Sequence, residues 1–148
     1  MRTYTLQAEQ RIARPLGEIF PFFAEPRNLE RLTPPWLRFE ILTPGRLEMR
    51  AGLLIDYRIR LHGLPLRWQS EITVWDPPRR FIDEQRRGPY RLWIHEHTFE
   101  ESQGVTTVRD CVNYAVFGGA MIRRLFVAPD LERIFSFRRE ALQQLFGS

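Results

Sequence analysis

The segment GPYRLWIHEHTFEE, residues 88–101, alternates polar side chains with large apolar or imidazole side chains. Successive side chains of a β-strand point to opposite faces, so every second residue of this segment would share one face. Trp93 and Phe99 are of types that fill protein interiors, and they mark that face as the inner one. His95 and His97 lie on the same face, so the segment predicts a strand that carries two histidines toward the interior.

The alternation recurs before and after this segment, which predicts a meander of strands. Short turn-forming stretches separate the strands, as at His62–Gly63 and Pro77–Pro78. Strands joined by such turns must be antiparallel, because a parallel pair needs a crossover of about a dozen residues or more. A first strand over 3–11 precedes the meander. The strands of the meander are predicted over 55–61, 68–72, 81–85, 93–99 and 106–114.

Helical periodicity follows the first strand. Pro15 suits the first position of a helix, and apolar residues continue at helical spacing until Pro26 interrupts them. A second short helix is predicted over Arg27–Leu32, before the Pro34–Pro35 break. The chain is therefore expected to open with a strand and two short helices.

The last segment predicts one long amphipathic helix. Pro129 either starts this helix or kinks a longer one that begins near Gly119. The apolar positions form one stripe that would pack on the sheet. The stripe comprises Leu131, Ile134, Phe135, Leu142 and Leu145, and Arg133, Arg138, Arg139 and Gln143 are expected largely off it.

Length and composition predict one compact domain over residues 1–148. With 148 residues and a hydrophobic content of 43%, the chain is large and apolar enough to form a core. A meander of six or seven strands with one apolar face needs a cover, and the C-terminal helix is the only long one available. The expected fold class is α+β, a curved antiparallel sheet wrapped around that helix with two short helices after the first strand. A hollow is expected between sheet and helix.

Two motifs carry a resemblance to a known family. The segment GPYRLWIHEHTFEE and the segment LERIFSFRREAL, residues 131–142, together with the order of elements, resemble the START-like helix-grip superfamily. Within it, the chain is similar to SRPBCC ligand-binding proteins near the polyketide cyclase/dehydrase group. The resemblance implies a deep hydrophobic cavity between sheet and helix, in which family members bind or transform lipids, polyketides, sterols or plant hormones.

The inner face of the predicted strands suggests a histidine–aspartate pair. If the turn between the last two strands pairs Phe99 with Thr106, His95 lies opposite Asp110. A carboxylate beside a buried imidazole fixes its tautomer and favours its charged form. His95 and Asp110 are therefore the candidate catalytic dyad, and His97 is a substitute partner on the diagonal.

Other side chains are expected on the same inner face. Asp83 and Gln85 share a strand with Phe81, and burying them without partners would cost several kcal/mol. The histidines or the Trp68 N–H could supply those partners, either as an internal network or as polar anchors for a ligand. The predicted ligand-binding residues are Tyr57, Trp68, Asp83, Gln85, Trp93, His95, His97 and Tyr114.

The two histidines leave four roles open, as hydrogen-bonded core residues, ligand contacts, acid–base catalysts or metal ligands. No metal is expected, because two histidines on one strand supply only two ligands and a zinc site uses three or four. Cys111 falls on the opposite face from Asp110 and no GxSxG motif occurs, so nucleophilic catalysis is not expected. No cofactor is predicted. Trp36 and Phe39 could form a lid at the cavity mouth or be ordinary aromatics.

The basic composition does not predict nucleic-acid binding. All 22 basic side chains are arginines and the net charge is +4, but these residues are scattered without a basic block. The only cysteine is Cys111, and the N-terminus lacks an apolar signal core. A cytoplasmic protein without a membrane span is therefore expected, and free sheet edges could pair two copies into a homodimer.

The leading functional hypothesis is binding of a small hydrophobic molecule, of lipid-like, polyketide-like or aromatic type, in the internal cavity. It depends on an aromatic inner face with few polar groups. The alternative is an enzyme of cyclase, dehydratase or hydrolase type, in which His95 acts as general acid or base and Asp110 orients it.

Overall fold

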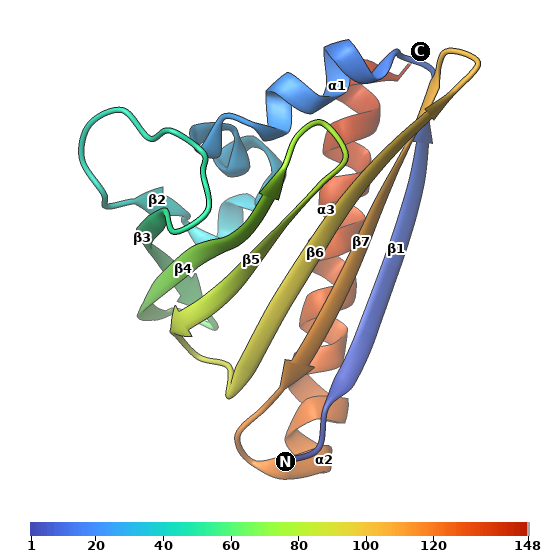
Figure 1. The fold of residues 1–148 in the computed structure, drawn as a ribbon. Coiled ribbons are helices and arrows are strands. Elements are labelled where there is room, and N and C mark those ends of the chain that lie inside the picture. Colours follow the sequence, from blue (N-terminus) through green and yellow to red (C-terminus); the bar gives the residue numbers. More distant parts are fainter. Residues whose placement is uncertain (148) are drawn as a thin grey trace.

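The computed structural model describes residues 1–147 and contains one curved sheet with helices on its concave side (Figure 1). The strands are β1 (Tyr4–Ile12), β2 (Glu40–Ile41), β3 (Leu54–Leu61), β4 (Leu64–Asp76), β5 (Arg80–Arg87), β6 (Leu92–Ser102) and β7 (Val105–Ala115). The helices are α1 (Leu16–Phe23), the 3₁₀ helices η1 (Pro26–Leu32) and η2 (Pro35–Leu37), α2 (Gly119–Ile122), the π-helical turn η3 (Arg123–Val127) and α3 (Ala128–Phe146).

The seven strands form one antiparallel sheet in the order β1-β7-β6-β5-β4-β3-β2. Figure 1 shows α3 crossing behind β6 and β7, with α1 closing one end of the sheet. This arrangement confirms the predicted α+β helix-grip fold. The second predicted helix is a 3₁₀ helix, and the two-residue β2 was too short to give an alternating pattern.

The β6–β7 turn sets the register of the central strands. Gln103 and Gly104 have φ angles of 52° and 77°, as a two-residue type I′ hairpin requires. This tight turn pairs Ser102 with Val105 and therefore Phe99 with Val108. The predicted pairing of Phe99 with Thr106 is wrong by two residues, because it placed the centre of the turn one residue too early in the chain. A shift of two residues keeps every side chain on its predicted face.

The C-terminal helix is longer than its apolar stripe. The segments α2, η3 and α3 follow one another without a break from Gly119 to Phe146. Pro129 lies in the first turn of α3, where a missing N–H is tolerated, directly after the π-helical turn. The structure thus agrees with the alternative of a helix that begins near Gly119.

One prediction about α3 is wrong. Arg138 was expected largely off the apolar stripe, but its side chain is buried, with 7% of its surface exposed. The physical reason is its spacing, because Arg138 lies seven residues after Leu131 and four before Leu142, on the face that contacts the sheet.

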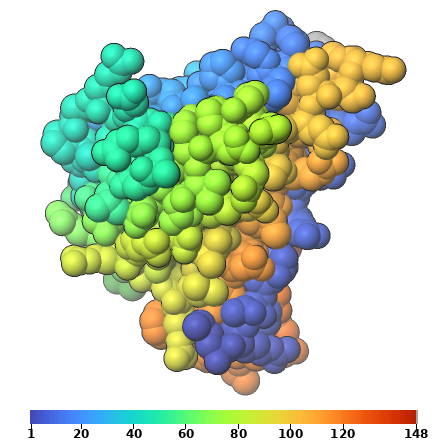
Figure 2. Space-filling model, viewed as in Figure 1, coloured from blue at the N-terminus to red at the C-terminus, as the bar shows by residue number. Residues whose placement is uncertain are grey.

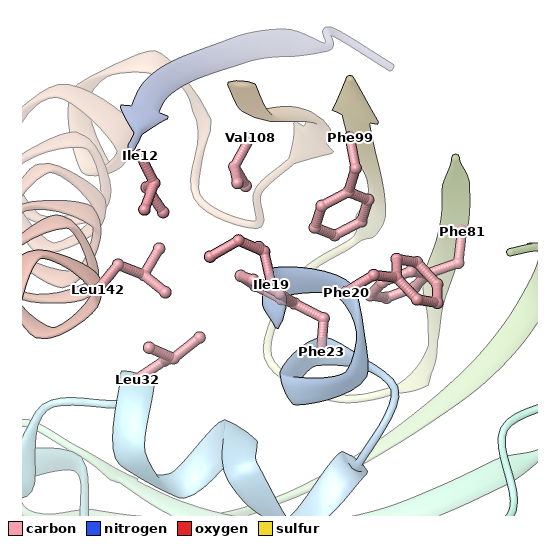
Figure 3. Close-up of a cluster of buried hydrophobic side chains, with 9 residues drawn as sticks. All are labelled: Ile12, Ile19, Phe20, Phe23, Leu32, Phe81, Phe99, Val108 and Leu142. Atoms are coloured by element: carbon pink, nitrogen blue, oxygen red, sulfur yellow. The ribbon is translucent and has the colours of Figure 1, made fainter. Parts of the chain in front are cut away.

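The main hydrophobic core fills the end of the molecule near α1. Figure 3 shows its side chains converging from α1, η1, α3 and the sheet. Phe20 and Phe23 of α1 contact Phe99 edge to face, with ring centroids 5.1 and 5.0 Å apart. A second cluster around Trp68, Trp93 and Leu131 occupies the other half. The two clusters leave space between them.

Candidate functional site

A cavity of about 210 Å³ lies between the sheet, η1 and α3. Its lining is largely apolar and aromatic, and its buried or half-buried charged and imidazole side chains lie on β5, β6 and α3. Such a lining, mostly apolar with a few convergent polar groups, is typical of a ligand pocket. Six of the predicted residues line it: Tyr57, Trp68, Asp83, Trp93, His95 and His97.

Two predicted residues lie outside the cavity lining. The side-chain amide of Gln85 bonds the backbone N–H and C=O of Tyr90, which fixes the β5–β6 turn. Tyr114 is buried to 2% exposure, and its hydroxyl accepts a hydrogen bond from Arg123 Nε at 3.2 Å. Both side chains are therefore hydrogen-bonded to other parts of the protein. Strand alternation alone does not reveal such partners.

The two aromatic residues predicted near the cavity mouth lie in different places. Phe39 lines the cavity and contacts Tyr57, with ring centroids 4.9 Å apart. Trp36 is 53% exposed and packs against Phe137 on the outer side of α3. Trp36 is therefore not placed as a lid over this cavity.

Two histidine–aspartate hydrogen bonds lie in the polar part of the cavity. His95 Nε2 is 2.8 Å from Asp110 Oδ1, and His97 Nε2 is 2.7 Å from Asp83 Oδ2. In the strand register His95 lies opposite Asp83, and His97 lies opposite Asp110. Each imidazole therefore bonds the carboxylate diagonal to it. The dyad contact between His95 and Asp110 exists, although the register that predicted it was wrong.

The imidazoles belong to a column of stacked rings that continues into the core. His95 and His97 have ring centroids 3.7 Å apart and planes inclined by 21°. His97 stacks on Phe81 at 4.1 Å, and Phe81 stacks on Phe99 at 6.1 Å. The stack fixes the planes of both imidazoles. The hydrogen bonds to Asp110 and Asp83 direct Nε2 of each ring toward a carboxylate.

Arg138 completes the cluster from the helix side. Its Nη2 donates to Asp110 Oδ1 at 3.1 Å, and its guanidinium carbon lies 5.5 Å from the ring centroid of Phe23. Asp110 therefore accepts hydrogen bonds from both β6 and α3. Sequence analysis missed Arg138, although its place on the helical stripe was a usable signal. We call Asp83, His95, His97, Asp110 and Arg138 the polar cluster.

The charges of the polar cluster shift the pKa values of its members. Burial alone would raise the pKa of Asp110, but the Arg138 guanidinium and the hydrogen bond from His95 hold it well below its usual range. Burial would likewise raise the pKa of Asp83. The hydrogen bond from His97 and the neighbouring positive charges outweigh burial and lower this pKa. Both carboxylates are therefore ionised at neutral pH.

Burial lowers the pKa of His97 to about 4, with a further contribution from His95. His97 is thus neutral at pH 7. An ionised carboxylate only accepts hydrogen bonds, so the proton of His97 lies on Nε2, toward Asp83. Its Nδ1 has no hydrogen-bond partner among the described residues.

His95 likewise faces an ionised carboxylate through Nε2. When its Nε2–H donates to Asp110, the Nδ1 of a neutral ring is a free acceptor. That atom is 4.0 Å from Asp83 Oδ2, too far for a hydrogen bond. Since His95 lines the cavity, this nitrogen can accept a hydrogen bond or a proton from a bound molecule.

A second polar group lies on the neighbouring strands β3 and β4. Ser70 Oγ accepts a hydrogen bond from Trp68 Nε1 at 3.0 Å and lies 3.2 Å from the Tyr57 hydroxyl. Burial, with the charge of Asp83, raises the pKa of Tyr57 well above its ordinary value. Tyr57 is therefore a neutral hydroxyl, suited to donate a hydrogen bond to a ligand carbonyl.

The polar cluster also offers ligand atoms for a metal. Donor atoms of Asp83, His95 and His97 lie within 4.8 Å of one another. The number of protein ligands is therefore three and not two, because β5 adds Asp83 to the two histidines of β6. However, a metal binds in the plane of an imidazole, and the stacked rings direct their lone pairs along nearly parallel planes. A shared ion would require one ring to turn, so we keep the prediction that no metal joins these histidines.

Solved structures with the same fold come from several bacteria. Protein CV1439 from Chromobacterium violaceum has a TM-score of 0.76, with 12% identity and coverage of 97% of both chains. Zhui aromatase/cyclase from Streptomyces sp. R1128 has a TM-score of 0.73, with 15% identity over 95% of this chain and 92% of its own. Protein Ms6760 from Mycobacterium smegmatis has a TM-score of 0.70, with 21% identity over 95% of this chain and 89% of its own.

These similarities show the fold alone, because sequence identities this low say nothing about function. No curated protein matches the sequence significantly. The match to a family model is more specific, because it covers residues 12–134, from the end of β1 into α3. The resemblance to the START-like helix-grip superfamily is thereby confirmed, and the chain belongs to the family described as polyketide cyclase / dehydrase and lipid transport.

Proposed function

We propose that the protein binds a small, mostly apolar, ring-bearing molecule in the cavity between the sheet and α3. The observation that carries this proposal is the combination of aromatic walls with a few polar groups, the polar cluster and the Tyr57–Ser70 pair. An apolar ligand body would contact the aromatic walls, and one polar end would face the polar cluster. The family description, which includes polyketides and lipids, supports the same ligand class.

The aromatic walls favour a flat ligand. Tyr57 and Trp68 stack with planes inclined by 17°, whereas Trp68 and Trp93 meet at 88°. Aromatic side chains that present both faces and edges to a cavity contact a planar ring in offset-stacked and edge-to-face arrangements. A volume of about 210 Å³ suits a compact molecule better than a long acyl chain.

The first test is native mass spectrometry of protein purified from its own host, in which a copurifying mass would identify the ligand. The second is titration with 1-anilinonaphthalene-8-sulfonate, a ring-bearing fluorescent probe. We expect wild-type protein to bind one molecule, and Ile59→Trp, which fills the cavity, to bind about tenfold more weakly or worse. Ile59 is 7% exposed on β3.

The matched control is Leu54→Trp on the same strand, because Leu54 is 46% exposed and lies outside the cavity lining. This control should bind the probe as wild type does. Equal binding by wild type and Ile59→Trp would show that the probe binds elsewhere, and the proposal would lose its support.

A second candidate function is catalysis of a cyclisation or dehydration by His95. The observation that favours it is the free Nδ1 of His95, because Asp110 holds the other nitrogen at 2.8 Å. In this arrangement His95 would abstract a proton from the bound molecule, Asp110 would stabilise the resulting imidazolium, and Tyr57 would polarise a carbonyl.

This alternative is tested by comparing the molecules that copurify with wild type and with His95→Gln. If His95 catalyses a dehydration, the variant should retain a substrate that is heavier by one or more water molecules than the wild-type product. A cyclisation without loss of water should instead show as a change in chromatographic retention and fragmentation at the same mass. If the same compound, by mass and by fragmentation, copurifies with both proteins, His95 is a binding residue only.

A further inference from the structure

Apolar side chains are exposed in unusual number between β7 and α3. Among the residues just before and within α2 and η3, the exposed fractions of Phe117, Met121, Leu125 and Phe126 are 61%, 68%, 55% and 52%. Ile122 is 39% exposed. Single exposed apolar residues are ordinary, but five within ten residues mark an interaction surface. We call Phe117, Met121, Ile122, Leu125 and Phe126 the apolar end.

The apolar end projects from one extremity of the molecule. Figure 1 shows α2 at the extremity that also carries the N-terminus, away from α1. In the space-filling view the N-terminal residues and this segment form the narrow tip of the molecule (Figure 2). Gly118 and Gly119 have φ angles of 90° and 78°, and they turn the chain outward from β7 at this point. A narrow tip reaches a flat partner without obstruction by the rest of the molecule.

The charge around the apolar end is positive. Arg123 and Arg124 lie within it, and no acidic residue occurs between Asp110 and Asp130. Arg123 packs over the ring of Tyr4, 4.1 Å from its centroid, whereas Arg124 is exposed. Asp130, the next acid along the chain, is already bound to His62 and Arg133. Apolar side chains interleaved with arginines are complementary to an anionic lipid surface.

The apolar end adjoins the ligand cavity. Phe126 contacts the ring of His62, with centroids 6.4 Å apart, and His62 Nε2 is 2.7 Å from Asp130 Oδ2. The residues next to this pair, Leu61 and Leu131, line the cavity. Leu64, on the same β3–β4 turn, is 66% exposed. The cavity therefore extends toward the tip that carries the apolar end.

We infer that the apolar end docks the protein on the surface of an anionic lipid bilayer. The apolar side chains would enter the boundary between headgroups and acyl chains, and the exposed Arg124 would contact anionic headgroups. Docking of this kind is peripheral, since no helix of residues 1–147 is long and apolar enough to cross a bilayer. In the docked orientation the Leu61 and Leu131 side of the cavity faces the lipid. An apolar ligand could then move between bilayer and cavity over a short path.

The test is cosedimentation of the full chain with vesicles of phosphatidylcholine, with and without phosphatidylserine, at low and physiological ionic strength. We expect binding to the anionic vesicles that weakens with added salt, and little binding to phosphatidylcholine alone. The double variant Met121→Ser/Phe126→Ser should bind about tenfold more weakly or worse. Arg124→Glu should lose about tenfold or more through charge alone.

Two control variants make the same chemical changes elsewhere. Leu54→Ser replaces an exposed apolar side chain at the start of β3, and Arg79→Glu reverses a charge on the β4–β5 turn, where the side chain is 75% exposed. Both controls should bind vesicles as wild type does. Circular dichroism should show that all variants are folded, because every substituted side chain is at least partly exposed.

Three results would overturn the inference. Wild type could fail to bind anionic vesicles at low ionic strength, or the double variant could bind as well as wild type. Light scattering could instead show a wild-type dimer that becomes a monomer in the double variant, which would assign the apolar end to a second copy of the chain. None of these results depends on the occupant of the cavity, so the proposed ligand binding would stand or fall separately.

Discussion

Arg138 of α3 and Asp110 of β7 form a hydrogen-bonded ion pair at 3.1 Å, with both side chains buried. The pair joins the long helix across the interior to β7, the strand next to the edge strand β1. Asp110 also holds His95, so one carboxylate links the fold to the candidate site.

The first prediction concerns this ion pair. Asp110→Asn should lower the free energy of unfolding by about 3–5 kcal/mol, because it leaves Arg138 buried without its counter-ion. Urea unfolding followed by tryptophan fluorescence measures the change. The double variant Asp110→Asn/Arg138→Met should recover part of the loss, and Asp56→Asn, on the exposed side of β3, should change little. A double variant less stable than both single variants would contradict an energetic role for the pair.

The second prediction concerns pH. The pKa of His97 is about 4 in the folded protein, below the ordinary value of 6.5. Between these values the unfolded chain binds more protons, so the free energy of unfolding should fall by about 3 kcal/mol as pH decreases from 7 to 4. Asp83 and Asp110, whose pKa values are lowered in the folded protein, reduce the free energy of unfolding mainly at lower pH, because their pKa values in the unfolded chain lie near 3.8.

Urea unfolding across this pH range should show a smaller slope for His97→Gln than for wild type. Proton NMR gives a direct check, since the His97 ring signal should not titrate above about pH 5. Titration of that signal near pH 6.5 would refute the assignment of a neutral His97.

The third prediction concerns Ser70. Its hydroxyl oxygen is the partner of both Trp68 Nε1 and the Tyr57 hydroxyl. Ser70→Ala leaves these groups without that partner and should cost about 1–3 kcal/mol in the free energy of unfolding. The tryptophan emission should change as well. Ser136→Ala on the exposed face of α3 is the control and should have little effect. Equal stability of the two variants would mean that a ligand or solvent replaces Ser70.

The fourth prediction uses two glycines with open space around them. A Cβ at Gly104 or at Gly17 would meet no atom within 4 Å, so only backbone conformation distinguishes the sites. Gly104 has a φ of 77° in the β6–β7 turn, and Gly104→Ala should destabilise the protein by about 1 kcal/mol. Gly17 lies in α1, where Ala should stabilise by about 0.5–1 kcal/mol. Thermal unfolding should show shifts of opposite sign, and a stabilising Gly104→Ala would contradict the type I′ turn.

The sequence predicted the sheet and the inner face of β6, because alternation depends only on local geometry. It did not predict the register, since the polar stretch between Phe99 and Thr106 is compatible with a turn centred at either of two adjacent positions. The pairing of His95 with Asp110 was nevertheless anticipated, because an error of two residues preserves the face. Arg138 was missed because a charged residue on a helix is usually solvated, and its buried partner lies on a distant strand.

The stacked column of Phe99, Phe81, His97 and His95 has a mechanical consequence. A ring in such a column cannot rotate unless its neighbours move. Phe99 is itself packed against Phe20 and Phe23 of α1. Displacing an imidazole would therefore strain the main core, which resists continuous deformation. The two imidazoles are therefore held in place by packing that ends at Phe99, outside the cavity lining. A ligand must adapt its shape to them.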